Sequence, residues 1–222
     1  MLAGAGDPER ALGQQAYMKS SIPYRGITSP ELRHLLRPLL ADPDLAPTTR
    51  GEWEADVRAL WDHPAYREER YAALALTGHR AAHGWQDPEA LDLYRHLVET
   101  GAWWDLVDPV AADRVGPILL RHREAVTPVI RRWAVDDDLW VRRTAVLAQL
   151  KHHEETDLDL LAEVLDANLE DSLHGRDFFV RKAVGWALRQ HARTDPEWVS
   201  AYVQSRGERL SGLSRREALK HL

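Results

Sequence analysis

The most unusual string in the chain is residues 103–108, which bring two tryptophans and two aspartates together as WWDLVD. If this segment is helical, Trp104 and Asp108 stand four residues apart and share one face, with the carboxylate within one turn of the indole ring. An indole face attracts a cation by about 0.5–2 kcal/mol, and a carboxylate adds direct charge attraction. The pair would therefore hold a cationic group. Packing of Trp104, with Asp108 as a turn residue before Pro109, explains the string equally well.

A further tryptophan stands behind a glycine later in the chain. Trp186 follows Gly185 within residues 184–189 (VGWALR), and a residue without a Cβ lets a neighbouring group approach closely. The chain has nine tryptophans, and packing is the usual role of this residue type. What Trp186 and the 103–108 string can do therefore depends on the elements that position them.

Those elements are predicted to be helices. Apolar residues recur at spacings of three and four, as in residues 32–40 and 91–98, and no segment alternates with a period of two. Three helix starts show an N-cap residue before a proline at the first helical position, followed by an acid. They are Ser29 in SPE, Asp87 in DPE and Asp195 in DPE. The sequence therefore predicts an all-α protein.

The predicted helices also repeat. Residues 138–146 (DLWVRRTAV) align with residues 177–185 (DFFVRKAVG) at an offset of 177 − 138 = 39 residues. Weaker copies lie at 66–74, 103–108 and 213–219. Spacings of about 34–40 residues are typical of two-helix solenoid repeats. We predict a right-handed superhelical solenoid of HEAT-like two-helix repeats with a concave face, in one domain over residues 1–222. An irregular helical bundle is the alternative.

Charge is distributed unevenly along the chain. The total of −6, from 29 Lys+Arg and 35 Asp+Glu, argues against a polyanionic partner. Residues 173–222, however, hold ten bases and five acids, which is +5 and leaves −11 elsewhere. Because one register faces one side in a repeat protein, the repeated basic pairs could line a groove. These pairs are Arg142/Arg143, Arg181/Lys182 and Arg215/Arg216. Solvated helix faces with ordinary ion pairs are the alternative.

Composition excludes several classes of protein. With 44% hydrophobic and 29% charged residues, the chain is typical of soluble globular proteins, and no apolar run approaches the roughly 18 residues of a membrane span. The absence of cysteine excludes disulfides, Cys-ligated metals and thiol catalysis. The 11 histidines form no HExxH string, and no glycine-rich phosphate loop occurs. We expect a cytoplasmic protein without metal, cofactor or membrane.

Five segments together resemble the AlkD family of bacterial DNA alkylation-repair glycosylases, and the resemblance covers nearly the whole chain. They are residues 17–19 with 26–27, 103–108, 140–143, 178–186 and 213–221. The resemblance implies a solenoid whose concave face wraps duplex DNA. It also implies hydrolysis of the N-glycosidic bond of cationic alkylpurines such as 3-methyladenine and 7-methylguanine.

The resemblance also assigns residues. Two tryptophans and an aspartate form the catalytic cleft of that family and an arginine holds the backbone of the lesion; by motif position these are Trp104, Trp186, Asp108 and Arg143. Further DNA-binding candidates come from the motifs and the basic pairs: Tyr17, Lys19, Thr28, Arg142, Arg181, Lys182, Arg189, Arg215 and Arg216. Thr28 stands where the family has glutamine, which would change a minor-groove contact.

The chemistry of the lesion suits this assignment. An N3- or N7-alkylated purine is already cationic, so it leaves without a general acid through a transition state like that of glycoside hydrolysis. The tryptophans would flank the deoxyribose and lesion, while Asp108 would stabilise the sugar cation and position water. No lysine stands within residues 103–108 to form a Schiff base, which predicts a monofunctional enzyme. The resemblance further implies a lesion left stacked in the duplex, whereas most such enzymes flip the base.

The expected partner is double-stranded DNA with alkylated bases, bound by a monomer that joins the nucleoid when on DNA. Two other interpretations stay open. A non-catalytic HEAT-like scaffold that binds DNA or protein would have no reason to keep Trp104, Asp108, Arg143 and Trp186 together. A self-resistance glycosylase for bulky alkyl-adenine adducts would share the same site, so the sequence does not separate it from general repair.

Overall fold

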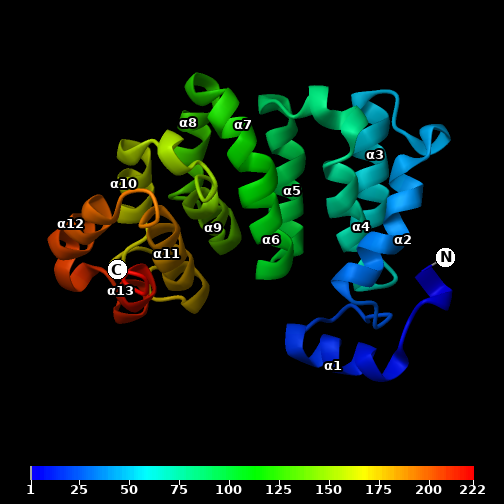
Figure 1. The fold of residues 1–222 in the computed structure, drawn as a ribbon, viewed down its shortest axis with the longest axis horizontal. Helices are drawn as coiled ribbons and strands as arrows, with labels where there is room; N and C mark the ends of the chain where they lie inside the picture. The colour runs from blue at the N-terminus through cyan, green and yellow to red at the C-terminus, as the bar shows by residue number, and fades with distance from the viewer. Residues whose placement is uncertain (1) are drawn as a thin grey trace. The chain divides into compact units, whose positions relative to one another are not determined.

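The computed structural model describes residues 2–222, and their regular elements are helices throughout (Figure 1). No strand occurs among these residues, which confirms the predicted all-α fold. The chain divides into two compact units, Met1–Gln86 and Asp87–Leu222. The single domain over residues 1–222 stays a prediction. None of the helices in residues 2–222 combines the length and the apolar content that a membrane span requires.

The N-terminal unit is built from short helices around a small apolar core. Its elements are η1 (Leu2–Gly4), α1 (Pro8–Met18), α2 (Ser29–Ala41), η2 (Pro43–Leu45), α3 (Arg50–Trp61), α4 (Arg67–Thr77) and η3 (Arg80–Trp85). α4 packs against both α2 and α3. Ile27, Leu32, Leu36 and Ala72 form a buried cluster between them. Trp53 and Trp61 are completely buried, which is the packing role expected of most tryptophans.

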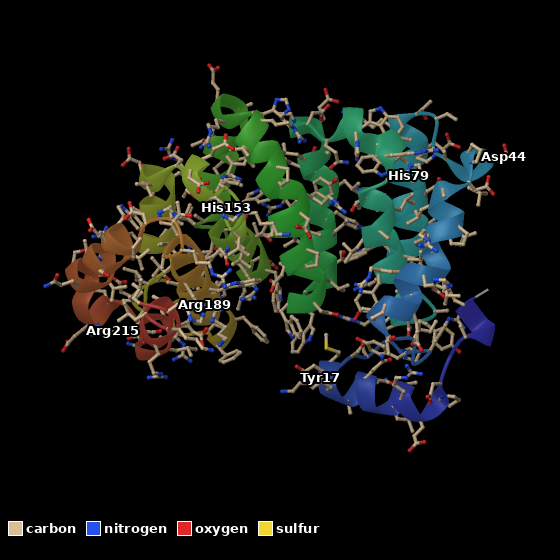
Figure 2. All side chains as sticks on the ribbon, viewed as in Figure 1. Tyr17, Asp44, His79, His153, Arg189 and Arg215 are labelled. Carbon is tan, nitrogen blue, oxygen red and sulfur yellow. The ribbon has the colours of Figure 1, made fainter. Side chains whose placement is uncertain are left out.

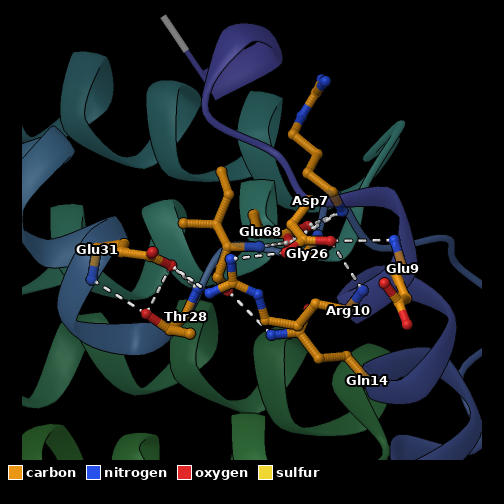
Figure 3. Close-up of polar contacts among 10 residues, drawn as sticks. Asp7, Glu9, Arg10, Gln14, Gly26, Thr28, Glu31 and Glu68 are labelled. Carbon is orange, nitrogen blue, oxygen red and sulfur yellow. Dashed lines mark hydrogen bonds and ion pairs between the residues drawn. The ribbon is translucent and has the colours of Figure 1, made fainter.

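A buried carboxylate from α4 holds the turn before α2 (Figure 3). Glu68 accepts hydrogen bonds from the backbone N–H groups of Arg25, Gly26 and Ile27 at 2.9, 3.1 and 3.2 Å. Gly26 has φ +85°, and a Cβ there would lie 1.9 Å from the carbonyl oxygen of Asp7. Only glycine fits this position, so the turn places the start of α2 firmly.

The C-terminal unit is a succession of packed helices. Its elements are η4 (Pro88–Ala90), α5 (Leu91–Gly101), α6 (Trp104–Val110), η5 (Ala111–Val115), α7 (Gly116–Arg121), α8 (Arg123–Trp133), α9 (Leu139–Leu147), η6 (His153–Glu155), α10 (Leu158–Asp166), α11 (Phe178–His191), α12 (Pro196–Arg206), η7 (Gly207–Arg209) and α13 (Gly212–Ala218). α9 packs against α5, α6, α8, α10 and α11, and α11 packs against α13. Helices therefore pack on the next helix of the chain and also on the helix beyond it, as in a two-helix repeat.

The two aligned repeat segments begin their helices in the same way. Asp138 caps α9 by accepting the N–H groups of Trp140 and Val141, and Asp177 caps α11 by accepting the N–H of Phe179. Each carboxylate satisfies a backbone donor that the first helical turn leaves without a partner. The common pattern in the sequence thus corresponds to a common local structure.

Two of the three predicted N-caps are confirmed, and the third lies one residue earlier than predicted. Asp195 caps α12, and Asp87 caps η4, which leads into α5. At α2 the N-cap is Thr28 and not Ser29 (Figure 3). Thr28 and Glu31 form a capping box, in which the Glu31 carboxylate accepts the Thr28 N–H at 2.7 Å. This reciprocal pairing draws Ser29 into the helix.

α11 and α13 approach each other closely at Gly185. A Cβ at this position would lie 2.6 Å from the Cβ of Glu217 and 2.9 Å from the carbonyl oxygen of Ser214. The expectation that Gly185 permits a close approach is confirmed, and the group that approaches is helix α13.

Candidate active site

The segment around Asp108 is helical but irregular. Trp104 and Asp108 both lie in α6, which confirms their four-residue helical spacing. Pro109 follows inside the helix, and residues 111–115 form a π-helical stretch, η5, before α7 begins. Proline removes a backbone donor, and π-helical stretches are frequent at functional sites.

Contacts with α9 and the residues after it fix this irregular segment. A Cβ on Gly116 would lie 2.4 Å from the carbonyl oxygen of Ala148, so the two backbones pass at a distance that only glycine allows. The Nε2 of buried His152 lies 2.9 Å from the carbonyl oxygen of Gly116. Both contacts anchor the end of η5, and with it the helical segment that carries Asp108.

Asp108 forms a bidentate ion pair with Arg143 of α9. Arg143 donates from Nε to Oδ1 at 2.7 Å and from Nη2 to Oδ2 at 2.8 Å, and its Nη1 donates to the carbonyl oxygen of Phe179 at 2.5 Å. The Arg143 side chain is 4% exposed and that of Asp108 is 14% exposed. Two parallel charge-assisted bonds fix both the position and the orientation of the carboxylate. Arg143 thereby joins α6, α9 and the first turn of α11.

Burial raises the pKa of Asp108 above its ordinary value, because the surrounding protein disfavours the charged form. The hydrogen bonds and the positive charge of Arg143 act in the opposite direction, and the charge of Asp105 adds to the rise in pKa. The carboxylate is therefore poorly solvated but held by a cation. Among the described residues, no three His, Cys, Asp or Glu side chains are grouped as a metal site would need.

An aromatic cluster lies beside this ion pair. Phe179 packs against Trp103, Trp140 and Phe178 with ring centroids 5.2, 4.9 and 5.4 Å apart. Trp103 also contacts Trp140, at 6.0 Å, and Phe178 is 53% exposed. Because the carbonyl of Phe179 receives the third bond from Arg143, the cluster and the ion pair form one structure.

The sequence prediction left Trp103, Trp140 and Phe179 out of the site. A signal for two of them was present, since Trp140 and Phe179 are related by the offset of 39 residues in the aligned repeat segments. Equivalent positions in neighbouring repeats face the same side, so this offset could have indicated that the two rings are neighbours. Trp103 carries no such signal, because its contact depends on the N-terminal turn of α6.

Trp186 lies half-buried in the middle of α11 between two cations. Lys182, Trp186 and Arg189 stand at i, i+4 and i+7, so they form one stripe along the helix. Glu217 of α13 accepts from both cations: Lys182 Nζ lies 2.7 Å from Oε1, and Arg189 Nη1 binds Oε2. Figure 2 labels Arg189 on α11. We call Lys182, Arg189 and Glu217 the Glu217 triad.

Arg142 does not belong to a basic groove, in contrast to the prediction. The side chain is buried, at 6% exposed, and its guanidinium donates to backbone carbonyl groups. The acceptors are the carbonyl oxygens of Val135, at 3.0 Å, of Ala167, at 3.3 Å, and of Asp136. Adjacent helical residues point about 100° apart, so Arg142 and Arg143 cannot face the same side of α9. Arg142 instead ties together the loops that flank the helix.

The remaining basic candidates of this unit differ in their surroundings. Arg181 is half-buried at the start of α11, and Arg216 is exposed on α13. Arg215, labelled in Figure 2, is half-buried and donates to the carbonyl oxygen of Gly207. The structure thus gathers Asp108, Arg143 and the aromatic rings at the start of α11. Lys182, Trp186 and Arg189 follow along the same helix.

The three candidates of the N-terminal unit lie around α1 and the start of α2. Tyr17 is 76% exposed near the end of α1 (Figure 2). Lys19 is the exposed C-cap of this helix, with φ 50° in the left-handed region. The hydroxyl of Thr28 is engaged in the capping box with Glu31 (Figure 3). A DNA contact by any of the three stays a prediction.

Comparison with known proteins identifies the family to which this chain belongs. Residues 1–222 match the model of a family described as DNA alkylation repair enzyme. A solved structure titled "Predicted DNA alkylation repair enzyme from Enterococcus faecalis" superposes with a TM-score of 0.84. It is 29% identical, and the match covers 98% of this chain and 96% of that chain. A search of curated proteins finds no match. The chain belongs to the DNA alkylation repair enzyme family.

Proposed function

We propose that this protein is a monofunctional DNA N-glycosylase of the AlkD kind, which hydrolyses the N-glycosidic bond of cationic alkylpurines in duplex DNA. The observation that carries the proposal is the Asp108 carboxylate, which Arg143 holds in a bidentate pair one helical turn from Trp104. A fixed anion beside an indole ring suits a reaction in which positive charge develops on a sugar.

The reaction breaks the bond between C1′ of the deoxyribose and the purine nitrogen, and the electron pair leaves with the base. Asp108 stabilises the resulting positive charge on the sugar, and its partial burial strengthens this attraction, because little water screens the carboxylate. Each Asp108 oxygen accepts one bond from Arg143 and keeps a lone pair for a water molecule. This water forms the new bond to C1′ and gives up its proton to the carboxylate or to solvent.

The two tryptophans have different tasks in this proposal. Trp104 lies on the same face of α6 as Asp108, and Trp186 lies on α11, between Lys182 and Arg189. Both rings are half-buried, so each keeps an accessible surface for the deoxyribose or the cationic base. Lys182 and Arg189, which flank Trp186, would bind the phosphates on either side of the lesion.

In this proposal Asp108 acts on the sugar of a lesion from the sugar-phosphate side of the duplex. Asp108 keeps 14% of its side chain exposed, which supports attack on a lesion that stays stacked in the duplex. Under this proposal the size of the alkyl group matters little, so bulky N3 or N7 adducts are substrates as well. Repair of simple methyl lesions and self-resistance to a bulky alkylator are then two uses of one site.

The test is mass spectrometry of the bases that the protein releases from duplex DNA treated with a methylating agent or with a bulky alkylator. The wild-type protein should release 3-methyladenine and 7-methylguanine, and Asp108→Asn should slow release by about 10²–10⁴-fold. Trp104→Ala should also slow release. Near-wild-type rates in both variants would falsify the mechanism.

The structure offers a matched control for Asp108→Asn. Asp166 of α10 accepts two bonds from Arg206, from Nε and Nη2 at 2.7 Å each, in the same bidentate geometry. Asp166→Asn removes the same charge from a bidentate pair of this unit without touching α6, and this pair is more exposed, at 27% for Arg206 and 34% for Asp166. It should leave excision unchanged, and an equal loss in both variants would mean that the effect is not specific to Asp108.

A further inference from the structure

The Glu217 triad gathers two cations around one carboxylate. Glu217 is 14% exposed, and its oxygens bind Lys182 Nζ at 2.7 Å and Arg189 Nη1. Lys182 is 40% exposed and Arg189 is 23% exposed, so both cations are accessible from solvent. Lys182 and Arg189 hold the pKa of Glu217 below its ordinary range, and the carboxylate of Glu217 therefore stays charged.

Backbone packing places Glu217 beside Trp186. The cations that it binds stand four residues before and three residues after this tryptophan on α11. At the adjoining Gly185, a Cβ would lie 2.6 Å from the Cβ of Glu217, so the close approach of α13 sets the position of the carboxylate. Glu217 thus lies between Lys182 and Arg189, the two cationic side chains that flank the candidate catalytic ring of Trp186.

The internal repeat relates the triad to the Asp108–Arg143 pair. Arg143 and Lys182 occupy equivalent positions, because 182 − 143 = 39 is the offset between the two aligned segments. Each donates to a carboxylate on another helix, Asp108 for Arg143 and Glu217 for Lys182. The first cation is 4% exposed and the second is 40% exposed. The two carboxylates are covered to the same extent, at 14% exposed each, so the pairs differ in the solvent access of the cation. Lys182 can therefore exchange its partner more readily than Arg143 can.

We propose that Glu217 is an intramolecular competitor for DNA phosphate, which occupies Lys182 and Arg189 in the free protein and must release them when a duplex binds. The proposal rests on the proposed function in one respect, that duplex DNA is the ligand. Carboxylate and phosphate oxygens accept the same charge-assisted bonds from Lys and Arg. Glu217 therefore weakens the binding of DNA beside Trp186 and so sets the affinity of the protein for a duplex.

The test compares binding of undamaged duplex DNA by fluorescence anisotropy at several salt concentrations. Glu217→Gln keeps the shape of the side chain and removes the competing charge. We expect about fivefold to tenfold tighter binding at moderate salt, and a log–log salt slope steeper by about 0.9 to 1.8, which is one or two additional phosphate contacts.

Glu163→Gln is the matched control. Glu163 pairs with Arg131 through α10 and α8 at 2.6 Å, and both side chains are about half exposed. This variant makes the same change of one unit in net charge at an ion pair outside α11 and α13. If Glu217→Gln binds DNA no more tightly and no more steeply with salt than Glu163→Gln, the proposal is overturned.

A second comparison tests whether the gain in affinity of Glu217→Gln acts through Lys182 and Arg189. In a Lys182→Gln/Arg189→Gln background the competitor has nothing to release, so adding Glu217→Gln should give no further gain in affinity. A gain that persists there contradicts the proposal. Circular dichroism melting of each variant shows whether α11 and α13 stay packed.

The outcome also separates this proposal from the glycosylase assignment. Tighter and steeper binding by Glu217→Gln, together with no release of alkylpurines by the wild-type protein, supports the competitor role and refutes the proposed activity. If the wild-type protein releases alkylpurines and Glu217→Gln has no effect on binding, the proposed activity is supported and the competitor role is refuted.

Discussion

The Asp108–Arg143 pair and the Glu217 triad use the same repeat position in two different ways. Arg143 is buried, bound twice to Asp108 and once to a backbone carbonyl, whereas Lys182 shares Glu217 with a second cation near the surface. The two carboxyl groups, each 14% exposed, also differ in their pKa values. The pKa of Asp108 is raised by desolvation, and that of Glu217 is lowered mainly by the hydrogen bond from Lys182.

The difference shows what burial adds to an ion pair. Removing one partner of a buried pair leaves a charge without solvent, at a cost of about 3–5 kcal/mol, so such a pair keeps its geometry. An exposed pair contributes little and can change partners. We infer that the first arrangement fixes a carboxylate for chemistry, while the second keeps two cations available for a ligand.

The largest expected effect comes from breaking the buried pair. Arg143→Met should lower the free energy of unfolding by about 3–5 kcal/mol, because Asp108 and the Phe179 carbonyl both lose their donor. Lys182→Met should leave the free energy of unfolding nearly unchanged. Urea denaturation followed by circular dichroism measures both values. Equal losses in the two variants would show that burial does not distinguish the pairs.

A smaller effect is expected where α13 meets α11. Gly185→Ala places a methyl group against Glu217 and the Ser214 carbonyl, and should lower the free energy of unfolding by about 1–3 kcal/mol through overpacking. Gly13→Ala is the control, because a Cβ there meets nothing within 4 Å in α1. It should stabilise the protein by about 0.5–1 kcal/mol through helix propensity. Thermal unfolding that moves in the same direction for both variants contradicts this account of the close approach.

The smallest expected effect is on pH dependence. In the proposed mechanism excision needs the ionised form of Asp108, and the raised pKa means that this form is lost at a higher pH on acidification than for an ordinary aspartate. The single-turnover rate should therefore fall by about tenfold per pH unit below the pKa of Asp108. Glu217→Gln should leave this acid limb in place. A limb that moves with Glu217→Gln would assign the titration to the triad.

Much of the local structure could be predicted from the sequence, because short-range chemistry determines it. The all-α fold, the caps at Asp87 and Asp195 and the close approach at Gly185 follow from periodicity, N-cap chemistry and the lack of a Cβ. The helical spacing of Trp104 and Asp108 belongs to the same group. The caps and the helical spacing depend on residues within a few positions of one another. At Gly185 the sequence predicts only that a close approach is allowed, and not that α13 makes it.

The parts that sequence reasoning missed depend on contacts between distant segments. Arg142 and Arg143 are indistinguishable as a basic pair, and only the packing of α9 sends one to loop carbonyls and the other to Asp108. The pairing of Glu217 with Lys182 joins residues 35 positions apart. No local pattern predicts such a partner, although the offset of 39 residues relates the two donors.

The π-helical stretch η5 has a further consequence, which concerns helical phase. A π turn takes up one residue more than an α turn, so the faces of α6 and α7 are offset by about 100° from those of an uninterrupted α-helix. With this offset, Asp108 on one side of η5 accepts from Arg143, and Gly116 on the other side passes close to Ala148. Loss of a single residue from 111–115 would restore the ordinary phase. Either the pair of Asp108 with Arg143 or the contact of Gly116 with Ala148 could then form, but not both.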